Sequence, residues 1–85
     1  MKLFIYSLKN ILFDGDAKSV NCKTTSGEIT VLDHHIPLIS ELAKGVMKIV
    51  DKKEQEHYIP VSSGFLQVND HNYTRCIVDE HSSSA

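Results

Sequence analysis

The sequence has 85 residues, a mass of 9.5 kDa and a net charge of −2 from 9 basic and 11 acidic side chains. This length allows a single domain with a thin core and excludes a second domain. The weak negative charge argues against nucleic-acid binding, and 41% apolar residues are typical of a folded chain rather than a disordered one.

Short apolar runs with a period of two, separated by glycine or polar clusters, predict strands along most of the chain. In one run, Val20 and Cys22 alternate with polar residues, so one face should be buried and the other wet. Residues 14–16 (Asp-Gly-Asp) and 62–64 (Ser-Ser-Gly) predict breaks between strands, and 51–54 predict a hairpin connection. In chain order, the expected strands are residues 3–8, 11–13, 17–23, 28–32, 46–50, 55–61, 65–68 and 73–78.

Residues 36–43 fit two different structures. Leu38 and Leu42 have helical spacing, whereas Pro37 could open a helix or sit on an edge strand. Strands this short and numerous can bury their apolar faces only against a second sheet. The sequence therefore predicts an all-β fold, a small β-sandwich of about eight to ten short, mainly antiparallel strands.

The ends of the chain carry their own expectations. Residues 1–8 resemble a signal-peptide core, but Lys9 and Asn10 interrupt it and no cleavage site follows, so we expect a cytosolic protein. Since no apolar stretch is long enough to span a bilayer, any membrane contact should be indirect. Residues 1–80 are expected to form the domain, with 81–85 as a flexible polar tail or a remnant of expression cloning.

The cysteines and histidines predict no catalytic or metal site. Cys22 and Cys76 lie far apart without a CxxC pair, which predicts two buried thiols in a reducing compartment. A nucleophilic role for either would require a histidine and an orienting polar group nearby, which spacing alone leaves open. The 5 histidines lack the spacing of zinc sites, so we expect scattered surface positions.

Short motifs follow one another in a characteristic order. They are a hydrophobic-Phe-x-Gly sequence at 12–15, a Gly-Glu loop at 26–28, a His-x-Pro stretch at 35–39, a Leu-x-x-Gly sequence at 42–45, a Gly-Phe-aliphatic-x-Val strand at 64–68 and an aliphatic strand ending in Asp at 77–79. This order, over nearly the whole chain, resembles the N-terminal β-sandwich of the epsilon subunit of the rotary F-type ATP synthase.

The chain also departs from that family. Thr30, Asp33 and His34 stand where the family tends to have Gly, Pro and Gly, Ser63 replaces a Gly, and Gln67 replaces a Glu. Because glycine allows positive φ at little cost, its loss predicts a stiffer or differently turned loop around residue 35. Most family members continue into two C-terminal helices, so we expect a short form or a truncation that couples without inhibiting.

The resemblance implies a non-catalytic central-stalk subunit that couples proton translocation to ATP synthesis, with no cofactor and no metal. Its implied partners are the gamma subunit and the polar loops of the c-ring, and its implied place is peripheral, at the cytoplasmic face of a bacterial inner membrane. By resemblance, Gly27 and Glu28 face the c-ring loops. The residues that lie toward gamma are, again by resemblance, His35, Ile36, Pro37 and Leu38.

Other interpretations stay open on the residues alone. Gly27 and Glu28 could form an ordinary solvated turn, and Ile36, Leu38 and Ile39 could be plain core. A free-standing β-sandwich that binds a peptide or ligand would need an aromatic-lined cleft, but the 3 Phe and 3 Tyr residues occupy mostly strand positions that look internal. A small metal-dependent enzyme would need convergent histidines, which their spacing does not supply.

Overall fold

The computed structural model describes residues 1–80, which form strands and no helix. The seven strands are β1 (Lys2–Tyr6), β2 (Ile11–Thr24), β3 (Gly27–Leu32), β4 (Leu38–Leu42), β5 (Gly45–Asp51), β6 (Glu56–Val68) and β7 (Tyr73–Glu80). Within this part of the chain β1 and β7 run parallel, and the other paired strands are antiparallel. The all-β, mainly antiparallel fold is thus confirmed, while the expected tail at 81–85 lies outside the described residues.

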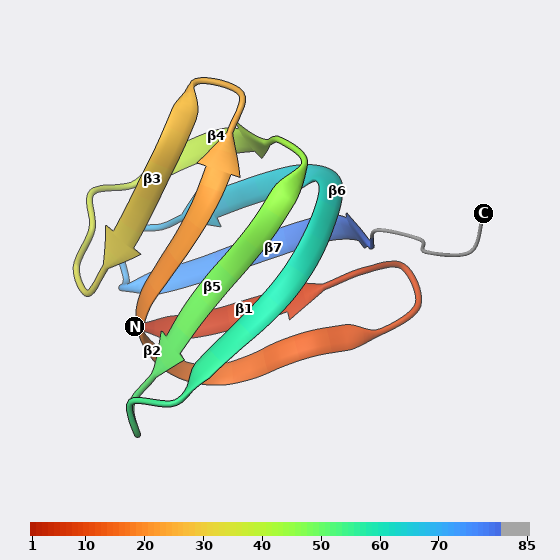
Figure 1. Cartoon of the computed structure of the whole chain (residues 1–85). Coiled ribbons are helices and arrows are strands. Elements are labelled where there is room, and N and C mark those ends of the chain that lie inside the picture. Colours follow the sequence, from red (N-terminus) through yellow and green to blue (C-terminus); the bar gives the residue numbers. More distant parts are fainter. Residues whose placement is uncertain (81–85) are drawn as a thin grey trace.

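The strands form two layers that pack face to face (Figure 1). Layer A consists of β1, β7, β4, residues 11–16 of β2 and residues 63–68 of β6. Layer B consists of β3, β5, residues 17–24 of β2 and residues 56–61 of β6. In Figure 1, β3 and β5 lie in front, with β1 and β7 behind them.

Strand β2 crosses from one layer to the other. The turn expected at 14–16 is wrong, because Asp14, Gly15 and Asp16 pair with β1 in unbroken register. The bend comes later, at a β-bulge between Ala17 and Ser19, where β2 leaves β1 and begins to pair with β5. Pairing across the layer therefore overrides the local turn preference of Asp-Gly-Asp.

Strand β6 makes the second crossing, and the break expected at 62–64 is also wrong. Pairing with β7 continues through this segment, with a bulge between Val61 and Ser63. Gly64 has φ +154°, and a Cβ on it would overlap the backbone oxygen of Ile77 and lie 2.9 Å from the Cα of Val78. Joining the expected runs on either side of residues 14–16 and 62–64 reduces the eight expected strands to six, and β4 is the seventh strand observed.

The ambiguous segment after the His35 loop becomes edge strand β4, paired with β6. Between the layers lies one apolar core of residues that are at most 9% exposed. The predicted alternation is confirmed, since Val20, Cys22, Met47 and Ile49 point inward. The hairpin at 51–54 is confirmed as well, with the amides of Lys53 and Gln55 donating to Asp51 Oδ1.

We expect Gly64→Ala to lower the free energy of unfolding by about 3 kcal/mol, because the new methyl group meets backbone atoms of β7 at a φ that side chains rarely adopt. Gly15→Ala is the matched control, since its Cβ would meet only Phe13 Cε1 at 3.8 Å. That change should be neutral or stabilising by up to about 1 kcal/mol. Urea unfolding followed by circular dichroism measures both, and equal losses would contradict the close-approach explanation.

Candidate partner-binding surface

The Gly27–Glu28 site begins β3 immediately after a tight turn. Thr24 Oγ1 donates to the Gly27 carbonyl at 2.7 Å and accepts from the Ser26 amide at 3.1 Å. Gly27 has φ +126°, a conformation that favours glycine. The Glu28 carboxylate is exposed and accepts a 3.0 Å hydrogen bond from Asn21 Nδ2. The turn therefore presents an oriented acidic group at one end of the sandwich.

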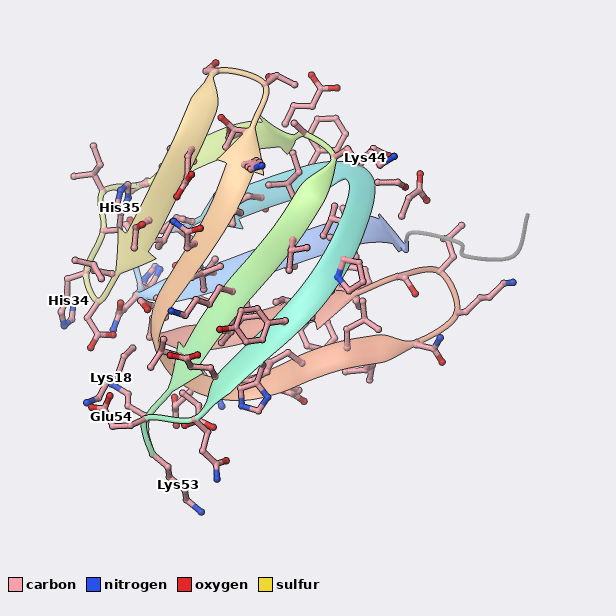
Figure 2. The ribbon with its side chains drawn as sticks, viewed as in Figure 1. Lys18, His34, His35, Lys44, Lys53 and Glu54 are labelled. Atoms are coloured by element: carbon pink, nitrogen blue, oxygen red, sulfur yellow. The ribbon has the colours of Figure 1, made fainter. Side chains whose placement is uncertain are left out.

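The His35 loop lies at the other end of β3 (Figure 2). His34 adopts φ 60°, the left-handed region that glycine would occupy at less cost, and its amide donates to Asn72 Oδ1 at 2.7 Å. The His35 amide donates to the Leu32 carbonyl at 3.2 Å, and Ile36 is 74% exposed. Hydrogen bonds of its backbone therefore fix the loop, while the apolar side chain of Ile36 is exposed to solvent.

The structure does not bring the two predicted regions together. Glu28 is the second residue of the six-residue strand β3 and His35 follows the far end of that strand, which spans about 17 Å at the usual rise. Pro37 is exposed and Leu38 is half-buried against the core, so only part of this segment faces outward. The candidate surface thus has two separate contact points.

Sequence reasoning missed a larger apolar surface on the outer side of layer A. We call it the outer apolar face; its residues are Phe4, Tyr6, Ile11, Ile39, Phe65 and Ile77. In register, Phe65 pairs with Ile77, Ile77 with Tyr6, and Tyr6 with Ile11, which makes a row across β6, β7, β1 and β2. Ile39 is 73%, Ile11 65% and Phe65 55% exposed, and the rings of Phe4 and Tyr6 stack at 4.9 Å. Exposed large apolar side chains gathered on one side of a sheet, rather than scattered singly, are typical of an interaction surface, so this face has the character of an interface.

The signal for this face was present in the sequence. Residues 3–6 (Leu-Phe-Ile-Tyr) and 76–78 (Cys-Ile-Val) are apolar at consecutive positions, which is typical of strands covered on both sides. The expectation that most aromatic residues are internal was wrong for most of them, because the buried core contains no Phe or Tyr and only Phe13 packs against it. Phe65 and Tyr58 are more than half exposed.

The thiols of the described residues are buried, and their histidines do not gather with other ligand-type side chains. Cys22 and Cys76 are buried and free, as predicted, and burial raises the pKa of the Cys22 thiol to about 11 and that of Cys76 further still. Such thiols are poor nucleophiles because the thiolate is disfavoured. Within residues 1–80 no three His, Cys, Asp or Glu side chains converge as metal ligands, and His81 lies beyond them.

One acidic residue anchors the start of the His35 loop. Asp33 pairs through Oδ1 with the ammonium group of Met1 and through Oδ2 with Lys52 Nζ at 3.2 Å. Hydrogen bonds from these two cations lower the pKa of Asp33 from 3.8 to about 2. The Met1 ammonium also donates to the Ala17 carbonyl at 3.0 Å, so this network joins the loop to β2.

Comparison with known proteins finds one family, both among family models and among individual relatives. A family model described as the β-sandwich domain of the ATP synthase delta/epsilon chain matches residues 1–80. The ATP synthase epsilon chain of Sulfurovum sp. (strain NBC37-1) is 38% identical over 79 residues, covering 93% of this chain and 61% of that relative. The epsilon chain of Shouchella clausii (strain KSM-K16) is 43% identical over 57 residues, covering 67% and 42%. The chain spans about half the length of the curated relatives it matches.

Solved structures share the same fold. A chain in the cryo-EM structure of the Euglena gracilis mitochondrial ATP synthase, with OSCP, F1 and c-ring, has a TM-score of 0.85 at 20% identity, covering 92% of this chain and 49% of that chain. A chain from the central stalk and c-ring of the Tetrahymena thermophila enzyme has a TM-score of 0.79 at 16% identity, covering 94% and 63%. At these identities the likeness concerns the fold alone.

The Asp33 network predicts an acid-dependent contribution to stability. Because the pKa of Asp33 is lowered on folding, the stabilisation is complete above the ordinary value of 3.8 and is lost as pH falls through about 2. Asp33→Asn should therefore lower the urea midpoint at pH 7, and the difference from wild type should close between about pH 4 and pH 2. Asp14→Asn, at an exposed strand position, should follow the wild-type curve throughout, and a constant difference for Asp33→Asn down to pH 2 would refute the ion-pair origin.

Proposed function

Because the chain belongs to the ATP synthase delta/epsilon family through its β-sandwich domain, we propose that it serves as a non-catalytic central-stalk subunit of a rotary F-type ATP synthase. In this role it binds the gamma subunit and the polar loops of the c-ring and couples proton translocation to ATP synthesis. The observation that carries the proposal is the outer apolar face. It is exposed to water in the single chain, and a partner that covered it would remove this apolar surface from water.

We propose that gamma covers the outer apolar face together with the exposed part of the His35 loop. The two are continuous, because the loop leads directly into β4, where Ile39 belongs to the face. Ile36 and Ile39 are both more than 70% exposed, so together they extend the apolar surface to this end of the sandwich. Docking there would bury these side chains and leave layer B outside the contact.

We assign the c-ring contact to the opposite end of β3. Glu28 offers an exposed carboxylate oriented by Asn21, which suits polar loops better than an apolar surface would. No helix in residues 1–80 is long and apolar enough to cross a membrane. By its family, the proposed place is peripheral, with the chain reaching a bacterial inner membrane from its cytoplasmic face through the complex. The alternative, a free-standing protein- or ligand-binding module, predicts no affinity for gamma or the c-ring.

The first test is binding to the cognate gamma subunit, which should give a stable 1:1 complex on size-exclusion chromatography and a calorimetric signal at micromolar concentration. Phe65→Ala should weaken this binding by about tenfold or more, because it removes an aromatic side chain from the proposed contact. Tyr58→Ala is the matched control: it lies in the same strand β6, is 57% exposed and faces outward from layer B. Separate elution of gamma and the wild-type chain would overturn the stalk assignment.

The second test concerns the c-ring contact. Glu28→Lys should leave the melting curve within about 0.5 kcal/mol of wild type, since the side chain is exposed, yet weaken coupling of proton flow to ATP synthesis in reconstituted vesicles. Glu54→Lys, at the β5–β6 hairpin tip labelled in Figure 2, is the control and should couple normally. Normal coupling in the Glu28 variant would exclude this residue from the contact.

A further inference from the structure

Arg75 occupies an unusual position on the outer side of layer A. It is the only arginine in the sequence, and it projects from β7 with Gln67 of β6 on one side and Phe4 of β1 on the other, in register. Its neighbours on the same side of β7 are Tyr73 and Ile77. A permanent positive charge thus stands beside the aromatic and aliphatic side chains of the outer apolar face.

None of the ion pairs found among the described side chains, which end at Asp79, involves this charge. These ion pairs use the cationic groups of Met1, Lys18, Lys48, Lys52, His57 and His71. Arg75 Nη2 instead donates to the neutral amide oxygen of Gln67 at 2.8 Å. The amide orients the guanidinium without neutralising it, and the other donors of the planar fork remain for a ligand.

A hollow lies beside the guanidinium. It has a volume of about 210 Å³ and is lined by Gln67, Asn69, Tyr73 and Arg75. A neighbouring groove of about 520 Å³ shares Gln67 and Asn69, and apolar surface there comes mainly from Pro37 and from the first two residues of β4, Leu38 and Ile39. The acidic residue of this groove, Asp70, is paired with His71 Nδ1 at 2.8 Å. A polar, cationic hollow therefore adjoins an apolar groove.

These features have one physical consequence for docking. If a partner covered the outer apolar face without compensation, the guanidinium would lose water and remain unpaired, which is costly. A partner carboxylate in the hollow could accept two parallel hydrogen bonds from the guanidinium while its apolar neighbours fill the groove. Arginine at the centre of an apolar contact is also a common site of concentrated binding energy.

We propose that Arg75 determines the specificity of the partner contact by receiving an Asp or Glu carboxylate of the gamma subunit, flanked there by apolar side chains. This inference rests on the proposed function, because it names the chemistry with which gamma meets the outer apolar face. Gln67 acts as a positioning residue that holds the guanidinium toward the hollow.

The test measures affinity of the full chain for its cognate gamma subunit by calorimetry. Arg75→Met, which keeps an unbranched apolar stem but removes the charge and the guanidinium donors, should bind about 30-fold more weakly. Gln67→Glu should also bind more weakly, by about tenfold, because the new carboxylate would occupy Arg75 within the chain. Arg75→Lys should be intermediate, since an ammonium group cannot form the bidentate contact. Each variant is first checked for a wild-type melting curve.

Lys53→Met is the charge control, because Lys53 lies at the hairpin tip away from this face (Figure 2). Weaker binding by the Arg75→Met and Gln67→Glu variants, with Lys53→Met at the wild-type value, supports the proposal. If Arg75→Met binds like wild type while Phe65→Ala binds weakly, this inference fails and the proposed function stands. If wild type does not bind gamma, both fail. If inorganic phosphate binds saturably at Arg75 of the isolated chain and this bound phosphate does not weaken the binding of gamma, Arg75 lies outside the gamma contact. That result would also overturn the inference.

Discussion

Strands β2 and β6 hold the two layers of the sandwich together, because each strand carries ladder hydrogen bonds in both. β2 pairs first with β1 and then with β3 and β5, while β6 pairs first with β5 and then with β4 and β7. The bulges at these crossings supply the bend that closes the layers over the core. The backbone itself therefore links the outer apolar face to the far side of layer B, and a load on one layer passes to the other through covalent bonds.

The strand positions could largely be predicted because burial leaves a period of two in the sequence, as in Val20 and Cys22 or Met47 and Ile49. The errors at Gly15 and Gly64 have a common cause. Composition gives the local turn preference of a segment, whereas these glycines are held in extended strands by pairing with β1 and β7, which lie outside the segments that contain them. Gly64 marks a close approach between strands rather than a turn, and a single sequence does not distinguish these two uses of glycine.

The candidate surface was predictable only in part. Gly27, Glu28 and Ile36 do lie exposed at loop ends, which polar breaks in a sequence reveal well. The outer apolar face was missed because apolar residues on both sides of a strand are normally assigned to the core, and only the structure separates Ile5, which is buried, from Tyr6, which is not. A role for Arg75 could be inferred only from the structure, which places Gln67 beside it. The sequence of neither strand specifies their register.

The burial of both native thiols makes this chain convenient for labelling. Cys22 and Cys76 are the only cysteines of the sequence, and both lie in the core with a raised pKa. A maleimide dye or cross-linker therefore finds no reactive native target while the sandwich stays folded. A cysteine introduced in place of exposed Val46 or Tyr58 on layer B would carry the label alone, leaving the outer apolar face free. Rotation or distance measurements by fluorescence could thus use the chain without first removing its own cysteines.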